Sequence, residues 1–498
     1  MLDTAVPHRL HRARARAAPP VTPPAGEVGT AGAWKVAVPP ALLMLVLGLW
    51  GITREGTLWG DEAVTYDMAR RTIPEIWRTL GSADAVHGLY YVLMHGVFAV
   101  GEPGLVALRL PSVLAMAATA AGVAVIGRRL AGPRAGLFAG LILPVLPTVQ
   151  RYAQEGRSYA LVCALVTWGT WLLLKRWWTA YAGVMLTACL LHEFAVLLVL
   201  AHGVTLWHGG RAPRLPGTGV LGRIPAVVSA LPRGWLVAAS VVVAGLAPLA
   251  LFSVTQSQQV DWIGFPSIHE LVLVALVAVL ARLAFRGPAM AAVRAVALPV
   301  LIVPMGLLLL VSLVHPLFVD RYVLSYVVGA ALLIGAAADR HWSRALVLAT
   351  AAAALITLVV HGPHLRSPDS RKNDVGEVAA AVAAIAEPGD GLLFTPTRRR
   401  VYTLAHPSAF RGLTDVSLAG TPRASDTLFG AEATPQEIRT RVLGERRIVA
   451  VQDLRGQPLD PFPVEAAKRD ALREGFRLQE ERVVGPVRIG VYIRVPAD

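Results

Sequence analysis

Long apolar stretches recur along this chain and constrain its fold more than any other feature. Of its 498 residues, 55% are hydrophobic and 16% are charged, against roughly a quarter charged in soluble domains. A helix of about 20 apolar residues crosses a hydrocarbon core of roughly 30 Å. The sequence therefore predicts a polytopic α-helical membrane protein with about eleven transmembrane helices. The predicted spans are 36–53, 104–127, 133–149, 158–176, 179–191, 194–208, 235–254, 268–285, 294–313, 322–338 and 344–361.

Basic residues indicate the orientation of these helices. Arg9, Arg12, Arg14 and Arg16 precede the first span, which predicts a cytoplasmic N-terminus in a multi-pass plasma-membrane protein. Alternating from there, the cytoplasmic loops carry most of the remaining Lys and Arg near the membrane, and an odd number of spans places the C-terminus outside. These residues are Arg128, Arg129, Arg134, Lys175, Arg176, Arg286, Arg294, Arg340, Arg344 and a basic segment at 209–234. The net charge of +14 thus reflects membrane topology and not nucleic-acid binding.

Composition divides the chain into three regions. Residues 1–33 are rich in Pro, Ala and Arg and are expected to be a disordered, basic cytoplasmic tail. Residues 34–363 form the transmembrane domain. In residues 364–498 charges and prolines return, and we expect a soluble, extracytoplasmic α/β domain there. Its predicted strands are 391–394, 447–451 and 487–495, and its predicted helices are 374–386, 435–444 and 463–474.

The first outer loop, residues 54–87, is too long to be a simple connection. Within it, Ile73, Ile76, Trp77 and Leu80 follow the i, i+3, i+4, i+7 spacing of an amphipathic helix. Such a helix can lie in the membrane interface with its apolar face against the acyl chains. We expect it to brace the polar residues of the loop at headgroup height.

Two adjacent acids, Asp61 and Glu62, follow the first predicted span within the segment Trp59-Gly60-Asp61-Glu62. Ionisable side chains near a bilayer tend to mark a pathway or a reaction site. Neighbouring residues point in different directions, so one acid could act as a base while the other orients it, binds a metal or bonds the backbone. The alternative is a solvated loop that carries two acids.

Further polar residues are predicted on the same side of the membrane. Tyr152, Glu155 and Arg157 lie at the outer end of one span, and Arg is well suited to phosphate because of its planar fork of donors. The alternative is a helical Arg151–Glu155 pair beside an interfacial Tyr. This convergence of separate segments favours a site more than any single residue does.

Histidines and a second arginine extend this set. His87 ends the first outer loop, and His192-Glu193 occupies a tight turn between two short spans, where a satisfied polar turn is the alternative. Arg321 follows Asp320 at the start of a later span and is a second candidate for binding phosphate. Its alternative is a snorkelling Arg beside a helix-start Asp.

Several other sites are excluded by the sequence. It contains no P-loop, no dinucleotide fingerprint after a strand and no zinc-type Cys/His spacing. Cys163 and Cys189 both lie in apolar helices and are expected to be small core residues. No cofactor is required, and a divalent cation near Glu62 or His192 is compatible with the sequence.

At these residues the chain resembles the family 39-like group of GT-C membrane glycosyltransferases, which includes protein O-mannosyltransferases and the lipid A aminoarabinose transferase. The resemblance covers roughly residues 36–360, with a terminal soluble domain beyond. The group commonly has prolines after the histidine of the second segment, where this chain has His87-Gly88, and the acceptor therefore stays open. The segments that carry the resemblance are LWGDEAVTYDMA (58–69), HGLYYVLMHGVF (87–98), ALRLPSVLAMAATA (107–120), RYAQEGRSYAL (151–161), LLHEFAVLLVLAH (190–202) and HPLFVDRYVLSYVVGAALL (315–333).

The resemblance implies a polyprenyl-phosphate sugar donor, an inverting transfer and a base in the first outer loop. Asp61 then takes the role of base and Glu62 a supporting role. The sugar is expected to be mannose or another hexose or pentose, and the acceptor a hydroxyl of a glycan, lipid or protein. The phosphate-binding candidates are Arg157, Arg321 and Tyr152, and the further site candidates are His87, Glu155, His192 and Glu193.

Two other functions remain open from the sequence. A lipid-linked sugar transporter or flippase would place ionisable residues deep within helices, whereas here nearly all of them lie near the membrane faces. A receptor that binds glycans through its C-terminal domain would not need Asp61.

Overall fold

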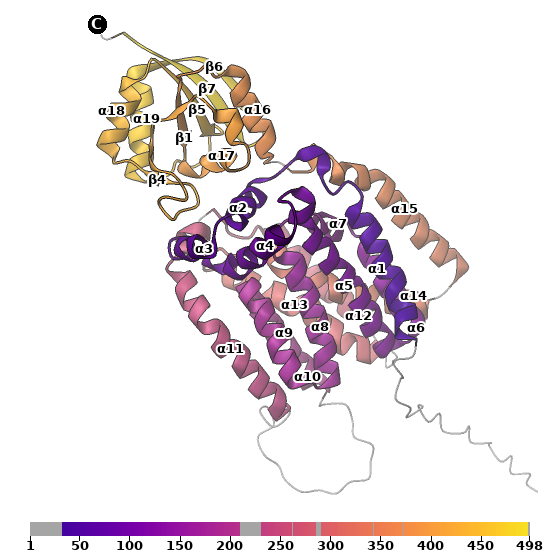
Figure 1. Ribbon diagram of the computed structural model, residues 1–498. Coiled ribbons are helices and arrows are strands. Elements are labelled where there is room, and N and C mark those ends of the chain that lie inside the picture. The colour runs from indigo at the N-terminus through magenta and orange to yellow at the C-terminus, as the bar shows by residue number, and fades with distance from the viewer. Residues whose placement is uncertain are drawn as a thin grey trace, which may run out of the picture.

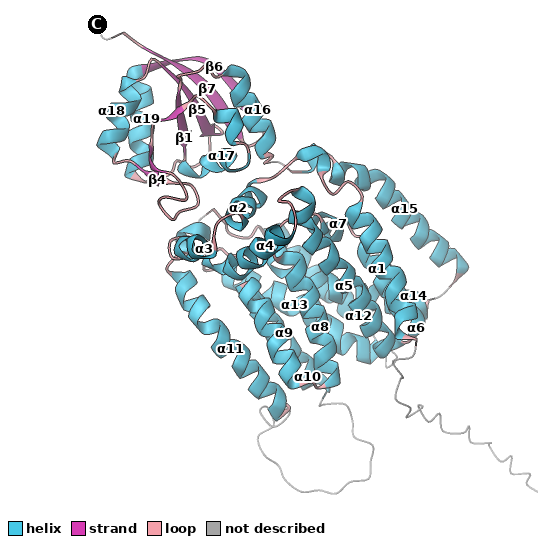
Figure 2. Cartoon of the chain, in the orientation of Figure 1, coloured by secondary structure: helices cyan, strands magenta, loops and turns pink. Residues whose placement is uncertain are grey.

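The computed structural model describes residues 32–209, 231–260, 262–284, 290–341, 343–371 and 373–496. Its first part is a bundle of helices, and its last part is a small sheet flanked by helices at one end of that bundle (Figure 1, Figure 2). The expected tail at 1–33 and the basic segment at 209–234 lie mostly outside the described residues. The disordered tail and the cytoplasmic location of the basic segment therefore stay predictions.

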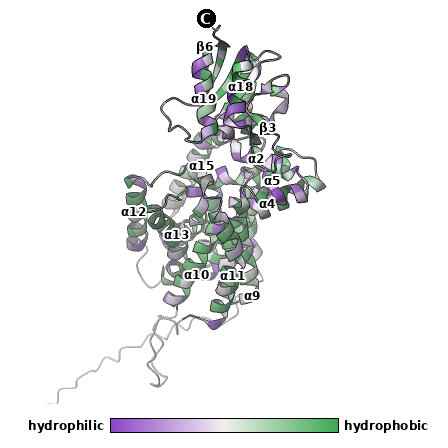
Figure 3. Cartoon of the chain, turned by 90° about the vertical axis from the view of Figure 1, so that its left-hand side faces the viewer, coloured by the Kyte–Doolittle hydropathy of each residue, from purple (hydrophilic) through white to green (hydrophobic). Residues whose placement is uncertain are grey.

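Every apolar stretch predicted as a span contains a helix. Among the described residues, five helical segments are long and apolar enough to cross a membrane, and shorter apolar helices pack among them. Apolar residues dominate the bundle (Figure 3), which is that of a multi-pass membrane protein, while the count of eleven spans stays a prediction. The helices are α1 (Ala33–Leu49), α5 (Leu105–Ala131), α6 (Pro133–Ile142), α8 (Tyr159–Lys175), α9 (Trp178–Leu191), α10 (Val196–Gly209), α11 (Arg233–Val254), α12 (Ile268–Ala284), α13 (Ala291–Ser312), α14 (Tyr326–Arg340) and α15 (Arg344–Arg366).

Small residues let the helices of the bundle approach closely. A Cβ atom on Gly127 of α5 would lie 2.9 Å from the Cα atom of Gly136 in α6, and one on Gly140 would lie 2.6 Å from Cγ of Pro40 in α1. Close backbone approach of this kind is how helices associate in a bilayer, where lipid is as apolar as Leu. Helix α5 consequently packs against α1, α6 and α8, and its first turns carry Arg109 to the end of the bundle where α2 lies.

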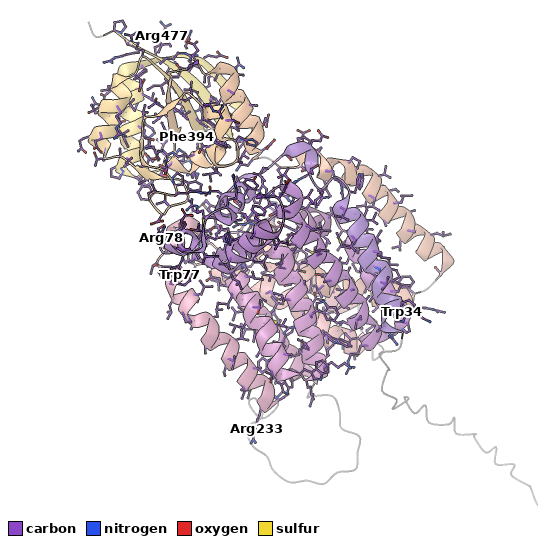
Figure 4. All side chains as sticks on the ribbon, viewed as in Figure 1. Trp34, Trp77, Arg78, Arg233, Phe394 and Arg477 are labelled. Carbon is purple, nitrogen blue, oxygen red and sulfur yellow. The ribbon has the colours of Figure 1, made fainter. Side chains whose placement is uncertain are left out.

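The basic connections gather at the other end of the bundle. Arg129, near the end of α5, donates to the carbonyl of Leu174 near the end of α8. Arg233 begins α11 at the end farthest from the sheet (Figure 4). Which compartment each end faces stays a prediction.

The first outer loop folds into α2 (Gly60–Ala69), α3 (Ile73–Leu80) and a turn before α4 (Gly88–Val100). Thr72 and Glu75 form a capping box at the start of α3, which satisfies two N–H groups of its first turn. The predicted amphipathic helix is thus confirmed as α3. Within α3, the Ile76 side chain is buried, whereas the Trp77 side chain is 77% exposed (Figure 4).

The C-terminal part is an α/β unit, and each predicted strand and helix in it is present. Strands β2, β1 and β5 pair in parallel, while β7 pairs antiparallel with β5 and β6 in the sheet order β2-β1-β5-β7-β6. Strand β6 was not predicted, because as a largely exposed edge strand it carries Glu and Arg instead of an apolar run. The elements are α16 (Val375–Ile385), β1 (Gly391–Thr395), α17 (Val401–Ala405), β2 (Thr414–Asp415), β3 (Leu418–Gly420), β4 (Ala431–Glu432), α18 (Pro435–Gly444), β5 (Arg447–Asp453), α19 (Pro463–Gly475), β6 (Phe476–Val484) and β7 (Val487–Arg494).

The sheet presents the carboxyl ends of β1 and β5 to the bundle. Strand β7 runs antiparallel to β5, and it ends on the side of the sheet away from the helix bundle (Figure 1). Helix α17, which follows β1, packs against α2. The N–H of Val375 donates to the carbonyl of Leu58 at 2.8 Å, and Arg71 donates to the carbonyl of Thr427 at 2.9 Å. The expected domain boundary at 363–364 falls within α15, and the α/β unit begins with α16.

Candidate active site

Asp61 and Glu62 lie in the first turn of α2 and point to opposite surroundings. The Asp61 side chain is 36% exposed, and its Oδ2 atom lies 3.7 Å from Nη2 of Arg321. The Glu62 side chain is completely buried. Successive residues of a helix differ in direction by about 100°, which explains how neighbours come to have such different environments. Asp61 is therefore the acid of the pair that a substrate can reach.

Glu62 is held by two buried arginines and one backbone N–H. Arg109 donates to both carboxylate oxygens at 2.8 and 2.7 Å, Arg54 donates to Oε2 at 3.1 Å, and the Gly156 N–H donates to Oε1 at 2.8 Å. Burial alone would raise the pKa of Glu62, but these donors outweigh burial and lower the pKa to about 2. Glu62 is a permanently charged anchor of α2, with no oxygen left for a metal ion.

Arg109 also fixes the chain that leads into α2. Its Nη1 and Nη2 atoms donate to the carbonyls of Ile52 and Thr57, both at 2.7 Å. Arg109 and Arg54 were not among the predicted site residues. The signal for Arg109 was present in the sequence, because it is a charged residue inside an otherwise apolar span.

Arg321 sits among aromatic rings next to Asp61. Its Nε atom donates to the Tyr159 hydroxyl at 3.1 Å, and its guanidinium lies 5.5–5.8 Å from the ring centroids of Trp59, Tyr159, Trp262 and Tyr322. Aromatic faces attract a guanidinium and leave its remaining N–H donors free to point elsewhere. Arg321 is thus oriented by rings and keeps donors for an anionic group.

Arg157 is buried on the inner side of the same region. Its Nη1 atom donates to Thr65 of α2 at 3.3 Å and to Tyr91 of α4 at 3.4 Å, while its Nε atom has no hydrogen-bond partner. Within the described part of the chain, Arg157 forms no ion pair. A buried guanidinium without a carboxylate is costly unless an anion joins it. Arg157 is therefore suited to a ligand that brings negative charge.

His87 and His192 face each other across the region, with ring centroids 5.9 Å apart. Burial, followed by the nearby Arg157, lowers the pKa of His87 well below its usual range, and burial also lowers that of His192. Both imidazoles are therefore neutral at neutral pH. The Nδ1 atom of each lacks a partner, so these rings can exchange hydrogen bonds with hydroxyl groups.

A small cavity lies beside Arg321 and His192. Arg321, His192 and Ser325 provide its polar wall, Tyr159 and Tyr322 add two aromatic rings, and apolar residues of the neighbouring helices provide the rest. The rings of His192, Tyr322 and Phe194 pack on one another, with centroids 4.8 to 5.6 Å apart. Aromatic rings with a guanidinium beside them are groups that can pack on a sugar ring and bind a phosphate oxygen.

Three predicted residues lie beside the cavity and have other partners. The Tyr152 hydroxyl is 3.4 Å from both oxygens of Asp320 and so supports the turn that carries Arg321. Glu193 accepts a hydrogen bond from Ser253 of α11 at 2.8 Å. Glu155 is buried.

Glu155 connects the site to the C-terminal part. Its Oε2 atom lies 3.4 Å from Nη2 of Arg371, and burial raises its pKa although Arg371 opposes this. The alternative Arg151–Glu155 pair is thus replaced by a partner distant in sequence. Across the described residues, no group of three or more His, Cys, Asp and Glu side chains could hold a metal ion.

No protein-family model and no curated protein matches this sequence. Among solved structures, ArnT from Cupriavidus metallidurans in the apo state is similar over 94% of this chain and 99% of that chain, with 14% identity and a TM-score of 0.51. The same protein bound to undecaprenyl phosphate matches 93% of this chain and 98% of its own, with 14% identity and a TM-score of 0.49.

The similarity to apo ArnT extends over nearly the whole chain, including the C-terminal part. The chain therefore has the fold of ArnT, a glycosyltransferase of the GT-C class. The resemblance inferred from the sequence is confirmed at the level of the fold.

Proposed function

We propose that this protein is a membrane glycosyltransferase that moves a sugar from a polyprenyl-phosphate donor to an extracytoplasmic acceptor hydroxyl. The observation that carries this proposal is the exposed carboxylate of Asp61, which lies 3.7 Å from Arg321, a residue that also lines a cavity with Tyr159 and Tyr322. The fold supports it, because ArnT, which shares the fold, has been crystallised with undecaprenyl phosphate.

The geometry supports an inverting displacement. Asp61 accepts the proton of the acceptor hydroxyl while that oxygen forms a bond to the anomeric carbon of the donor. The bond between the anomeric carbon and the phosphate oxygen breaks on the opposite side, and polyprenyl phosphate leaves with the electron pair. Arg321 and Arg157 compensate the charge that develops on this phosphate. The transferred sugar is proposed to be mannose or another hexose or pentose.

The direct test is release of polyprenyl phosphate. Purified protein in lipid nanodiscs is incubated with a panel of polyprenyl-phosphate sugars and hydroxyl acceptors, and both products are measured by mass spectrometry. We expect release with one donor class and almost none from Asp61→Asn protein. Movement of a lipid-linked sugar across vesicles without any release would instead support a transporter.

Loss of either arginine is expected to weaken donor binding more than turnover. Arg321→Ala and Arg157→Ala each remove a charged donor from the phosphate, which costs about 1.5–3 kcal/mol, or roughly 10–100-fold in donor affinity. The measurement is the KM for the donor, supported by direct titration with polyprenyl phosphate. Arg340→Ala, at the far end of α14, is the matched control and should leave donor affinity unchanged. Equal affinity in all three variants would contradict the phosphate assignment.

A further inference from the structure

A second cavity lies in the C-terminal part, separate from the one beside Asp61. It has an empty volume of about 470 Å³ and lies between the loops that follow β1 and β5. Its polar lining includes Gln452, Asp453, Arg455, Arg469 and Arg488. The proposed transfer reaction makes no use of these residues.

The position of this cavity in the sheet is typical of a ligand site. Strands β1 and β5 are parallel neighbours, and the chain leaves β1 for β2 on one side while β5 pairs on its other side. Open α/β sheets bind ligands at the carboxyl ends of their strands, where neighbouring connections diverge in this way. Phe394, near the carboxyl end of β1, and Arg477, at the far end of the sheet, show that this edge faces the bundle (Figure 4).

The lining offers donors to an anion. Arg469 is held through Nη2 by the carbonyl of Asp460, and Arg488 through Nε by the carbonyl of Asp453, which leaves other N–H groups of each for the cavity. Arg455 is 71% exposed and pairs with Glu481. The side-chain carbonyl oxygen of Gln452 accepts a hydrogen bond from the Tyr492 hydroxyl at 2.9 Å. The side-chain N–H groups of Gln452 therefore remain for a ligand.

Positive charge prevails around this cavity. The carboxylate of Asp453 is already paired with Arg398 and Arg399 from the loop after β1. Glu481 is shared between Arg455 and Arg488. The lining itself carries three guanidinium groups, those of Arg455, Arg469 and Arg488, against the two carboxylates of Asp453 and Asp460, and an anionic ligand would offset this excess of positive charge.

A path of contacts runs from Asp453, which lines this cavity and pairs with Arg399, to the start of α2. The Nη1 atom of Arg399 donates to the Tyr402 hydroxyl at 3.2 Å, and that hydroxyl donates to Asn373 at 3.2 Å. A Cβ atom on Gly60 would lie 2.8 Å from Nδ2 of Asn373, so Asn373 covers the residue just before Asp61. The cavity and Asp61 are therefore linked through contiguous packed groups on the same side of the bundle.

We propose that this cavity binds an anionic saccharide, a sugar bearing phosphate or carboxylate, as the distal part of the acceptor. Several guanidinium groups donate hydrogen bonds to the phosphate or carboxylate oxygens. The amide N–H groups of Gln452 donate to the sugar hydroxyl groups, and carbonyl oxygens of the loops accept from them. The acceptor role rests on the proposed transferase function. The binding of the saccharide does not depend on it.

The test is direct binding to the full-length protein in nanodiscs, without donor, by isothermal titration calorimetry. The probes are mannose 6-phosphate, glucuronate, mannose and inorganic phosphate. We expect saturable binding of mannose 6-phosphate or glucuronate, at least about tenfold tighter than either mannose or inorganic phosphate. The comparison of the two acids identifies whether phosphate or carboxylate is the group recognised.

Variants locate the binding. Arg455→Ala, an exposed position, and the double variant Arg455→Ala/Arg469→Ala should weaken binding by about tenfold or more. Arg473→Ala on α19 is the control, because its side chain is 74% exposed and lies outside the cavity lining. Asp61→Asn should bind as tightly as the natural protein. No saturable binding, equal binding of mannose or inorganic phosphate, or unchanged binding in the double variant would each overturn the proposal.

Failure of this proposal and failure of the proposed function are distinguishable. The calorimetric experiment involves no sugar transfer, and the assay for polyprenyl phosphate release can be run with simple hydroxyl acceptors. Transfer without saccharide binding would remove the second cavity from the acceptor site. Saccharide binding without transfer would leave a saccharide site in a protein of another activity.

Discussion

Replacement of Asp61 by Asn is expected to lower turnover by roughly 10²–10⁴-fold while the protein stays folded and binds donor normally. Asn is nearly isosteric with Asp but cannot accept the proton of the acceptor hydroxyl. The Asp61 side chain is partly exposed, and Arg321 keeps its hydrogen bond to Tyr159 and its aromatic neighbours in the variant, so the fold should be preserved. The measurement is single-turnover transfer with saturating donor, together with thermal unfolding in detergent.

The control for this prediction is another outer carboxylate. Glu102 lies exposed in the loop between α4 and α5, and Glu102→Gln should leave both turnover and stability unchanged. Near-normal turnover of well-folded Asp61→Asn protein would show that Asp61 is not the base. If that protein still released polyprenyl phosphate while the Arg321→Ala variant did not, the arginine and not the acid would dominate the chemistry.

Loss of either member of the Glu62–Arg109 pair is expected to destabilise the whole outer end of the bundle. Both side chains are fully buried, and removing one partner of a buried ion pair typically costs about 3–5 kcal/mol, because the other charge stays without compensation. Glu62→Gln and Arg109→Met should therefore give poorly folded protein with a much lower melting temperature. Their activity should fall with the folded fraction.

A surface ion pair provides the comparison. Arg78 and Asp426 join α3 to the C-terminal part, with side chains 54% and 35% exposed. Arg78→Ala should cost no more than about 1 kcal/mol, because exposed pairs are screened by water. If Glu62→Gln were as mild as Arg78→Ala and lowered only turnover, Glu62 would have a chemical role that its contacts do not indicate.

The effect of pH provides an independent check on Glu62. Its pKa is lowered to about 2 in the folded protein, against about 4.5 for an ordinary Glu. A lowered pKa stabilises the fold above the unfolded value, and this contribution is lost as the pH falls from about 4.5 toward 2. The difference in melting temperature between natural and Glu62→Gln protein should therefore be constant near neutral pH and shrink across that acidic range.

The sequence was most informative where a local pattern has one physical solution. Apolar runs of span length require helices, because a lipid environment leaves backbone groups no other partners. The amphipathic spacing of α3 and the main strands of the sheet were predicted for similar reasons. The edge strand β6 was missed because exposed positions impose little pattern.

The candidate site was partly predicted, as a set of polar segments on one face. The structure brings Asp61, Arg157, His87, His192 and Arg321 around one region, whereas Glu193 turns toward α11. Which of two adjacent acids is exposed could not be read from the sequence. That depends on Arg54 and Arg109, which come from other segments and bury Glu62.

By itself, the sequence determined that this chain is a multi-pass helical membrane protein. It also determined that an α/β unit follows, since hydropathy and periodicity are local properties. Only the tertiary structure decided the partners of each charge. A buried ion pair such as Glu62–Arg109 joins residues that are distant in sequence, and its energy depends on desolvation, which only packing creates. The contact between Asn373 and Gly60 likewise joins residues distant in sequence, and it packs the C-terminal part on the helix that carries Asp61.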